Sequence, residues 1–86
     1  MRKITFTADA FKEYNEWIKK DFETVQKILL LLRDIQQNPF KGLGKPEPLK
    51  GNFSGYWSRR ISQKDRLVYR VTNEAIEIIK CEGHYL

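Results

Sequence analysis

Hydrophobic and polar residues repeat with two different periods along the chain, and the change of period predicts its elements. Lys3–Phe6 has the β-branched and aromatic content of a short strand. From Ala8 to about Lys20 the apolar residues recur at helical spacing, which predicts an amphipathic helix. Asp21 is a suitable N-cap for a second helix. That helix should end at Asn38, because the residue before a proline is disfavoured in the α region.

The second half of the chain has the pattern of a loop followed by a sheet. Phe40–Gly55 is rich in glycine and proline, which predicts an ordered loop with a short extended piece around Glu47–Lys50. Three runs then alternate with a period of two, and the connections between them have hairpin length. The runs are Tyr56–Ser62, Arg66–Thr72 and Ala75–Cys81, joined by Gln63–Asp65 and Asn73–Glu74. We therefore expect an α+β fold, with two helices packed on one face of a small twisted, mainly antiparallel sheet.

Length and composition indicate one folded domain spanning residues 1–86. A chain of 86 residues is too short for two independent cores, and 41% hydrophobic residues are too many for a disordered chain. The longest unbroken apolar run, Ile28–Leu32, is far below the roughly 20 residues that cross a bilayer. The first residues are not followed by a signal-like apolar region. We expect a cytoplasmic protein with no membrane association.

Positive charge is concentrated in the middle of the chain. The formal net charge is +5, yet residues 39–71 alone carry eight basic and two acidic groups. A surface that only needed to be soluble would mix the two signs. The concentration predicts a polyanion or an acidic partner, without saying which.

The scarcity of cysteine and histidine excludes several classes of site. One cysteine permits no internal disulfide and no multi-cysteine zinc site, and the chain has one histidine. We expect no metal and no cofactor. Cys81 follows the strand alternation and is interpreted as a small buried apolar residue.

Strand alternation predicts which basic side chains share a face of the sheet. If the helices cover Trp57 and Ile61 on one strand, then Leu67 and Val71 are the covered residues on the next. The opposite, uncovered face then carries three arginines, Arg60, Arg66 and Arg70. Such a set forms a cationic concavity, but it is equally typical of the solvated side of any sheet.

Two further side chains are candidates for proton transfer. Glu47 lies between two prolines and is the only carboxylate between Asp34 and Asp65. A rigid carboxylate among cations suits a general base, and it is also typical of a simple loop ion pair. His84 carries the one imidazole, a group that exchanges protons near neutral pH, although chain ends often fray.

Together these groups fit one reaction. Cleavage of RNA by its own 2′-hydroxyl needs a base, cations that hold the charge on phosphorus, and an acid for the departing 5′-oxygen. Glutamate, arginine and histidine supply those roles without a metal. Exposed aromatic residues, Tyr56 and Tyr85, are candidates for stacking on unpaired bases.

Four ordered motifs resemble a known family over essentially the whole chain. They are Pro39-Phe40-x-Gly-x-Gly44-Lys-Pro-Glu-Pro-Leu-Lys50, Ser54-Gly-Tyr-Trp-Ser-Arg-Arg-Ile61, Arg66-Leu-Val-Tyr69 and His84-Tyr85. The chain closely resembles the Txe/YoeB toxins of bacterial type II toxin–antitoxin modules, within the RelE/ParE superfamily. The resemblance implies a ribosome-dependent endoribonuclease that cuts mRNA in the ribosomal A site and so inhibits translation. The implied products carry a 2′,3′-cyclic phosphate or 3′-phosphate and a 5′-hydroxyl.

The same resemblance implies residue roles and partners. Glu47 matches the general base, Arg66 a catalytic cation and His84 the general acid. Three further residues match substrate contacts, namely Lys50, Arg60 and Tyr85. The implied partners are the ribosome, its mRNA and a YefM-type antitoxin. The toxin–antitoxin complex is expected to bind operator DNA mainly through the antitoxin, and the free toxin is either a monomer or a homodimer.

The chain departs from the family pattern at two positions. Asp65 stands before the Arg66 motif where the family often has histidine, which places an anion beside Arg66. Leu86 extends the chain past the usual terminal tyrosine. A non-enzymatic reading stays open: a ParE-like gyrase poison, an RNA- or DNA-binding module, or an inhibitor that only occupies the A site. The joint presence of Glu47, Arg66 and His84 favours the enzyme.

Overall fold

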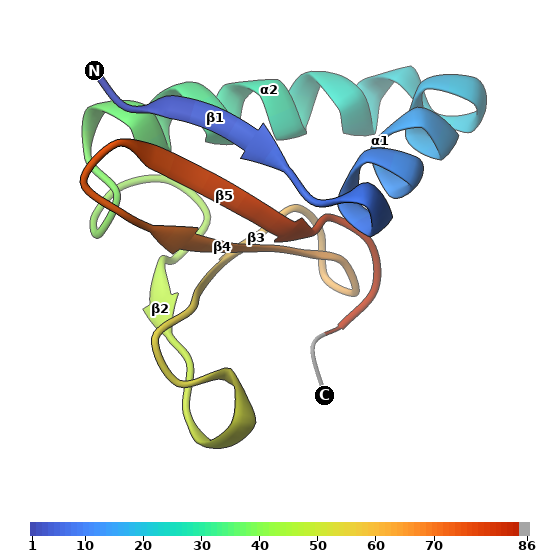
Figure 1. Cartoon of the computed structure of the whole chain (residues 1–86). Coiled ribbons are helices and arrows are strands. Elements are labelled where there is room, and N and C mark those ends of the chain that lie inside the picture. Colours follow the sequence, from blue (N-terminus) through green and yellow to red (C-terminus); the bar gives the residue numbers. More distant parts are fainter. Residues whose placement is uncertain (85–86) are drawn as a thin grey trace.

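Two helices cover one face of a five-stranded sheet in the computed structural model, which describes residues 1–84 (Figure 1). The helices are α1 (Ala8–Lys20) and α2 (Phe22–Gln37), and a single 3-10 turn, η1, spans Gly51–Phe53. The strands are β1 (Lys3–Phe6), β2 (Glu47–Pro48), β3 (Trp57–Arg60), β4 (Arg66–Val71) and β5 (Ala75–Lys80). The predicted α+β class is confirmed, and three predicted strands are each shorter by one to three residues.

The strand order is β1-β5-β4-β3-β2, which places the first strand beside the last. β1 pairs with β5 in parallel, whereas the other neighbouring strands are antiparallel. Figure 1 shows this pairing as the blue first strand lying beside the red last strand. The sheet is therefore mainly antiparallel, as predicted.

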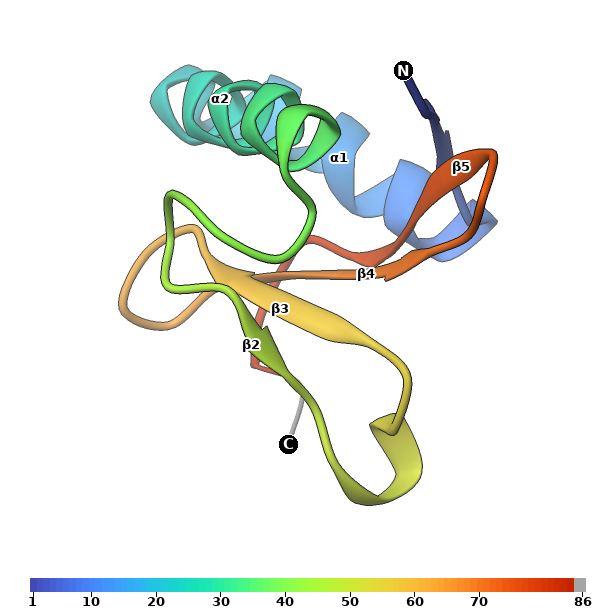
Figure 2. The same ribbon diagram turned by 90° about the vertical axis from the view of Figure 1, so that its left-hand side faces the viewer.

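One residue separates the two helices and serves both. The backbone N–H of Asp21 donates to the carbonyl of Trp17 and ends α1. The Asp21 carboxylate accepts from the backbone N–H of Thr24 at 3.3 Å and from its hydroxyl at 2.8 Å, which begins α2. The predicted N-cap is confirmed, and both helices lie on the same side of the sheet (Figure 2).

The main core lies between the helices and the sheet. The helices contribute Ala10, Trp17, Val25, Ile28, Leu31, Leu32 and Ile35, and the sheet side contributes Ile61, Leu67, Tyr69, Ile76, Ile78 and Cys81. Cys81 is fully buried, as predicted, and this burial raises the pKa of its thiol to about 12. No helix within residues 1–84 is long and apolar enough to cross a bilayer.

Arg59 is a charged residue inside this core. It shares the helix-covered face with Trp57, as alternation predicts, and its side chain is fully buried. The guanidinium forms an ion pair with Asp34 and donates to the carbonyl oxygens of Asn38 at 2.7 Å and Lys41 at 2.9 Å. This satisfied charge fastens the loop after α2 to the sheet.

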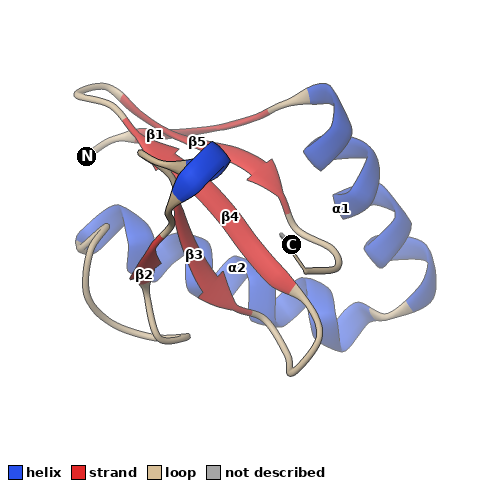
Figure 3. Ribbon diagram, turned by 90° about the horizontal axis from the view of Figure 1, so that it is seen from below, coloured by secondary structure: helices blue, strands red, loops and turns tan. Residues whose placement is uncertain are grey.

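The opposite face of the sheet is less open than the alternation pattern predicts. Ser58 and Val68 lie on it, yet both are buried. Figure 3 views this side, with the helices behind the sheet and with η1 and the segment after β5 in front of it. Since these segments come from loops, their return onto the sheet is not visible in strand periodicity.

Candidate active site

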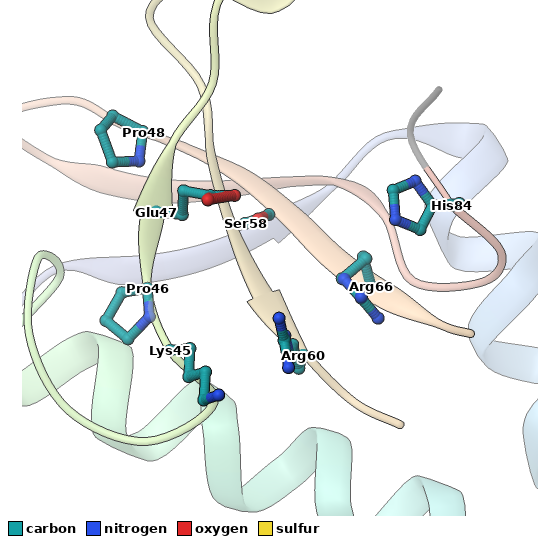
Figure 4. Close-up of a pocket in the computed structure, with 8 residues that line it drawn as sticks. All are labelled: Lys45, Pro46, Glu47, Pro48, Ser58, Arg60, Arg66 and His84. Carbon is teal, nitrogen blue, oxygen red and sulfur yellow. The ribbon is translucent and has the colours of Figure 1, made fainter. Parts of the chain in front are cut away.

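A pocket of about 410 Å³ opens on the sheet face opposite the helices. Its walls are formed by Lys45, Pro46, Glu47, Pro48, Ser58, Arg60, Arg66 and His84 (Figure 4). All three residues predicted to be catalytic therefore lie around one space, although they are 37 positions apart in the chain at the extremes. In the view of Figure 4, Glu47 and His84 occupy opposite sides, and Arg60 and Arg66 lie along the lower side.

The strand register explains how β2, β3 and β4 supply this wall. Glu47 is the cross-strand partner of Ser58, and Arg60 is the cross-strand partner of Arg66. Ser58 and Arg60 are two residues apart on β3 and so point to the same face. Facing arginines repel one another. An anion held between them would relieve that repulsion.

The loop that carries Glu47 is held in place from inside the molecule. Arg59 donates to the carbonyl of Leu43 at 3.0 Å, and the Leu43 N–H donates to the Asp34 carboxylate at 2.9 Å. These contacts, the Leu43 amide first and Arg59 second, hold the pKa of Asp34 below its ordinary value. The carbonyl of Gly44 also accepts from the backbone N–H of Arg60 at 2.7 Å. The loop is thus joined to β3 one residue before Lys45.

Lys45 occupies a strained backbone position at the pocket wall. Its φ of +53° lies in the left-handed region, and it is the only non-glycine residue with a positive φ among residues 1–84. The preceding Gly44 also has a positive φ, of +77°. Two left-handed residues in succession turn the chain sharply just before Pro46 and β2. Lys45 is thereby placed in the lining of the same pocket as Glu47.

Arg66 is anchored by part of its guanidinium. Its Nη1 donates to the carbonyl oxygens of Ser62 at 2.8 Å, Gln63 at 3.1 Å and Asp65 at 3.2 Å. The anion expected beside Arg66, the Asp65 carboxylate, forms hydrogen bonds to other residues. The Asp65 carboxylate accepts from the Ser62 hydroxyl at 3.1 Å and from the Gly83 N–H at 2.8 Å.

His84 stands on a segment that several contacts fasten to the rest of the fold. Both backbone groups of Cys81 are bonded: its carbonyl accepts from the Trp17 indole at 2.8 Å, and its N–H donates to Glu13 at 2.7 Å. Lys20 and Glu82 form an ion pair at 3.2 Å. The chain therefore does not fray before His84, which reaches the pocket wall.

Other predicted residues lie away from this wall. Lys50 is exposed and precedes η1, and it does not line the pocket. Arg70 shares the sheet face but forms an ion pair with Glu77 at 2.9 Å, so the expected set of three arginines reduces to two at the pocket. Tyr56 packs edge to face on Phe53. Tyr85 lies outside the described residues, and its role stays a prediction, as does that of Lys50.

Two wall residues were not identified as functional from the sequence. Ser58 alternates to the same strand face as Arg60, but a serine in a strand carries no chemical signal by itself. Lys45 was visible only as one of several cations near Glu47. In the structure Ser58 is buried directly opposite Glu47, where its hydroxyl is available to the same pocket.

The chemistry available in the pocket is one carboxylate, one imidazole and three cationic side chains. Such a set favours a phosphodiester: the cations bind its charge, and the carboxylate and imidazole can take and give protons. Within residues 1–84 no group of three or more histidine, cysteine, aspartate or glutamate side chains is arranged to hold a metal ion.

Comparison with known proteins agrees with this description. Residues 6–85 match the profile of a family described as the YoeB-like toxin of bacterial type II toxin–antitoxin systems. Toxin YoeB of Streptomyces coelicolor is 47% identical over 83 residues, covering 96% of this chain and 99% of that protein. The structure of a YoeB/ParE toxin from Agrobacterium tumefaciens superposes with a TM-score of 0.94 at 46% identity, covering 96% and 99% of the two chains.

Two structures of the Staphylococcus aureus protein are also similar. A YoeB dimer superposes with a TM-score of 0.92 at 45% identity, covering 98% of each chain. A YoeB–YefM complex superposes with a TM-score of 0.90 at 43% identity, covering 99% of each chain. With a family match over nearly the whole length, the chain belongs to the YoeB-like toxins of bacterial type II toxin–antitoxin systems.

Proposed function

We propose that this toxin is a ribosome-dependent endoribonuclease that cuts mRNA in the ribosomal A site and thereby inhibits translation. The observation that carries the proposal is the meeting of Glu47, Arg66 and His84 around one pocket. Family membership supports the toxin role, and the pocket supports a reaction on a phosphodiester. The proposed place of action is the cytoplasm, where translating ribosomes are found.

The reaction begins with removal of a proton. The Glu47 carboxylate takes the proton of the 2′-hydroxyl, and the resulting oxygen forms a bond to the adjacent phosphorus. Arg60, Arg66 and Lys45 stabilise the added negative charge on the phosphoryl oxygens. Such donors act best when they are already in position, and the anchoring of Arg66 by Ser62 supports that.

The second half of the reaction releases the downstream strand. The bond from phosphorus to the 5′-oxygen breaks, and His84 donates a proton to that oxygen. The products are a 2′,3′-cyclic phosphate and a 5′-hydroxyl. Addition of water across the cyclic phosphate then gives a 3′-phosphate. Lys50 and Tyr85 are proposed to contact the mRNA beyond the pocket.

A YefM-type antitoxin is the proposed partner. The Staphylococcus aureus relative forms a complex with YefM and is also seen as a dimer. The net charge of +6 over residues 39–71 would attract an acidic segment of the antitoxin, and the complex would bind operator DNA mainly through the antitoxin. The dimer of that relative supports a homodimer as the proposed state of the free toxin.

Primer extension on mRNA translated by purified ribosomes tests the proposal. The toxin should produce a cut that requires ribosomes, and Glu47→Ala and His84→Gln should each slow it by about 10²- to 10⁴-fold. Arg70→Ala is the matched control, because Arg70 lies on the same sheet face but pairs with Glu77 away from the pocket. Inhibited translation without a cut would instead indicate an inhibitor that only occupies the A site, and poisoning of gyrase would indicate a ParE-like activity.

A further inference from the structure

Asp65 contacts the residue directly before His84. Its Oδ1 accepts from the backbone N–H of Gly83 at 2.8 Å, and its Oδ2 accepts from the Ser62 hydroxyl at 3.1 Å. Asp65 is only 6% exposed, so water competes little for these bonds. The Ser62 oxygen also accepts from the Asp65 N–H at 3.1 Å. Ser62 therefore binds both the backbone and the carboxylate of Asp65 and restricts the movement of its side chain.

Gly83 is held through its other backbone group as well. Its carbonyl accepts from the backbone N–H of Arg66 at 2.9 Å. Asp65 and Arg66, the first residue of β4, therefore bind both backbone polar groups of one glycine. The φ of Gly83 is +74°, a left-handed conformation that turns the chain at this point, and the next residue is His84 at the pocket wall.

This arrangement links two groups of the pocket. Arg66 presents its guanidinium to the pocket and its backbone N–H to Gly83, so Arg66 and the residue before His84 share one attachment point. The Asp65 carboxylate supplies the second attachment. Without Asp65, the peptide plane between Glu82 and Gly83 loses its bond, and Gly83 is held only by the Arg66 bond to its carbonyl.

We infer that Asp65 is a positioning residue that holds the C-terminal segment so that His84 faces the pocket. The expected effect of Asp65 on cleavage rests on the proposed nuclease function, whereas the contact between Asp65 and Gly83 does not. Asp65 touches no substrate and acts only through Gly83 and His84. A small displacement of an acid group from its proton acceptor can lower a rate by about 10²-fold.

Amide hydrogen exchange, followed by NMR on the free toxin, tests the contact without any activity. The Gly83 amide of the unmodified protein should exchange slowly, like a strand amide. Asp65→Ala should accelerate that exchange by about tenfold or more, leaving core amides such as Leu67 unchanged. Asp65→Asn should keep the protection, because its amide oxygen accepts the same bond.

Single-turnover cleavage on programmed ribosomes tests the consequence. Asp65→Ala should lower the maximal rate by about 10- to 100-fold with little change in half-saturating toxin concentration, and Asp65→Asn should restore most of it. In a His84→Gln background, Asp65→Ala should add almost no further loss, because its effect passes through the imidazole. Glu77→Ala is the matched control, since it removes the exposed ion pair with Arg70 away from the pocket and should cut normally.

Three results would overturn the inference. They are fast exchange of the Gly83 amide in the unmodified protein, normal cutting by Asp65→Ala, and a full multiplicative loss when Asp65→Ala is added to His84→Gln. The first needs no variant, so it decides even if Asp65→Ala fails to fold. Absence of cutting by the unmodified toxin is different: it rejects the nuclease proposal, and the exchange data alone then judge the contact.

Discussion

Arg60 and Arg66 are direct partners across β3 and β4, and both side chains line the pocket. Like charges placed opposite one another in a sheet reduce its stability. Retention of such a pair is understandable where an anion binds between the two groups. The pair is therefore better explained by the proposed phosphate contact than by folding.

Replacement of Arg60 should separate stability from function. Arg60→Thr removes the repulsion and introduces a β-branched residue at an exposed strand position, so the free energy of unfolding should rise by about 0.2–1 kcal/mol. Cleavage should fall at the same time, because a transition-state cation is lost. Urea unfolding and primer extension measure the two effects.

The matched variant is Arg70→Thr, on the neighbouring part of the same face. It removes an exposed ion pair with Glu77, which is worth about 0–1 kcal/mol, and should leave cleavage unchanged. A stability loss on Arg60→Thr as large as that on Arg70→Thr would show that the Arg60–Arg66 pair is not repulsive.

Replacement of Lys45 should also separate stability from function. Its φ of +53° suits glycine better than lysine, so Lys45→Gly relieves backbone strain of roughly 1–2 kcal/mol, partly offset by the greater freedom of the unfolded chain. We expect unchanged or slightly higher stability and slower cleavage, because one cationic side chain is removed from the lining of the pocket. Thermal unfolding and single-turnover kinetics measure this; Lys41→Gly, in the same loop but outside the pocket, is the control. Loss of stability on Lys45→Gly would contradict the account of strain.

Acid should weaken the attachment of the loop that carries Glu47. The pKa of Asp34 is lowered in the folded state by the Leu43 amide and by Arg59. A carboxyl group with a lowered folded pKa contributes stability that is present above its unfolded pKa, about 3.9, and is lost as the pH falls through the folded value. Asp34→Asn should therefore be less stable than the unmodified protein at pH 7, and the difference should shrink toward pH 2–3. Urea midpoints at both pH values test it; a constant difference would exclude Asp34 as the titrating group.

Arg59 should be the most costly residue of this network to remove. Arg59→Leu takes one of two donors from the partly exposed Asp34 carboxylate and removes the donor to the carbonyls of Asn38 and Lys41, and acceptors left unsatisfied in this way cost about 1–3 kcal/mol each where they are buried. Arg33→Leu, on the neighbouring α2, is the control and should be near neutral. Equal stability of the two variants would remove the case for Arg59 as the anchor of the loop.

Cys81 should be a reporter of unfolding. Burial, with smaller effects from Glu13 and Glu82, raises the pKa of its thiol to about 12, so native protein at pH 8 contains almost no reactive thiolate. A thiol reagent at pH 8 should label Cys81 only as fast as the protein opens, and added urea should accelerate labelling. Because the folded pKa exceeds the unfolded value near 9, stability from this group is lost as the pH rises from about 9 toward 12. Labelling at the rate of a free small-molecule thiol would contradict the buried position.

Local pattern was enough to predict the elements and half of the site. Asp21 marked the joint between the helices, and alternation put Arg60 and Arg66 together on the face away from them. Glu47 could be selected because it is the only carboxylate between Asp34 and Asp65, and His84 because it is the only histidine. The match to family motifs assigned them roles before any geometry was known.

What could not be predicted depends on contacts between distant segments. Strand alternation places Arg59 on the core side of the sheet. Its buried charge is tolerated because the loop after α2 folds back, so that carbonyl oxygens of the loop accept hydrogen bonds from the guanidinium. Arg70 pairs with Glu77 on the adjacent strand, which removes it from the pocket. In the sequence, Asp65 places an anion beside Arg66. In the structure, its carboxylate instead accepts from the Gly83 N–H, 18 residues later.

The central claim is that the 2′-oxygen of mRNA attacks its own phosphodiester in the pocket formed by Glu47, Arg66 and His84. Its most direct test is an mRNA with a single 2′-deoxy nucleotide immediately before the cut, placed in the A site of a purified ribosome. The account predicts no cleavage of this mRNA, and a 2′,3′-cyclic phosphate or 3′-phosphate with a 5′-hydroxyl on the unmodified control. Cleavage of the deoxy substrate, or a 3′-hydroxyl product, would contradict it.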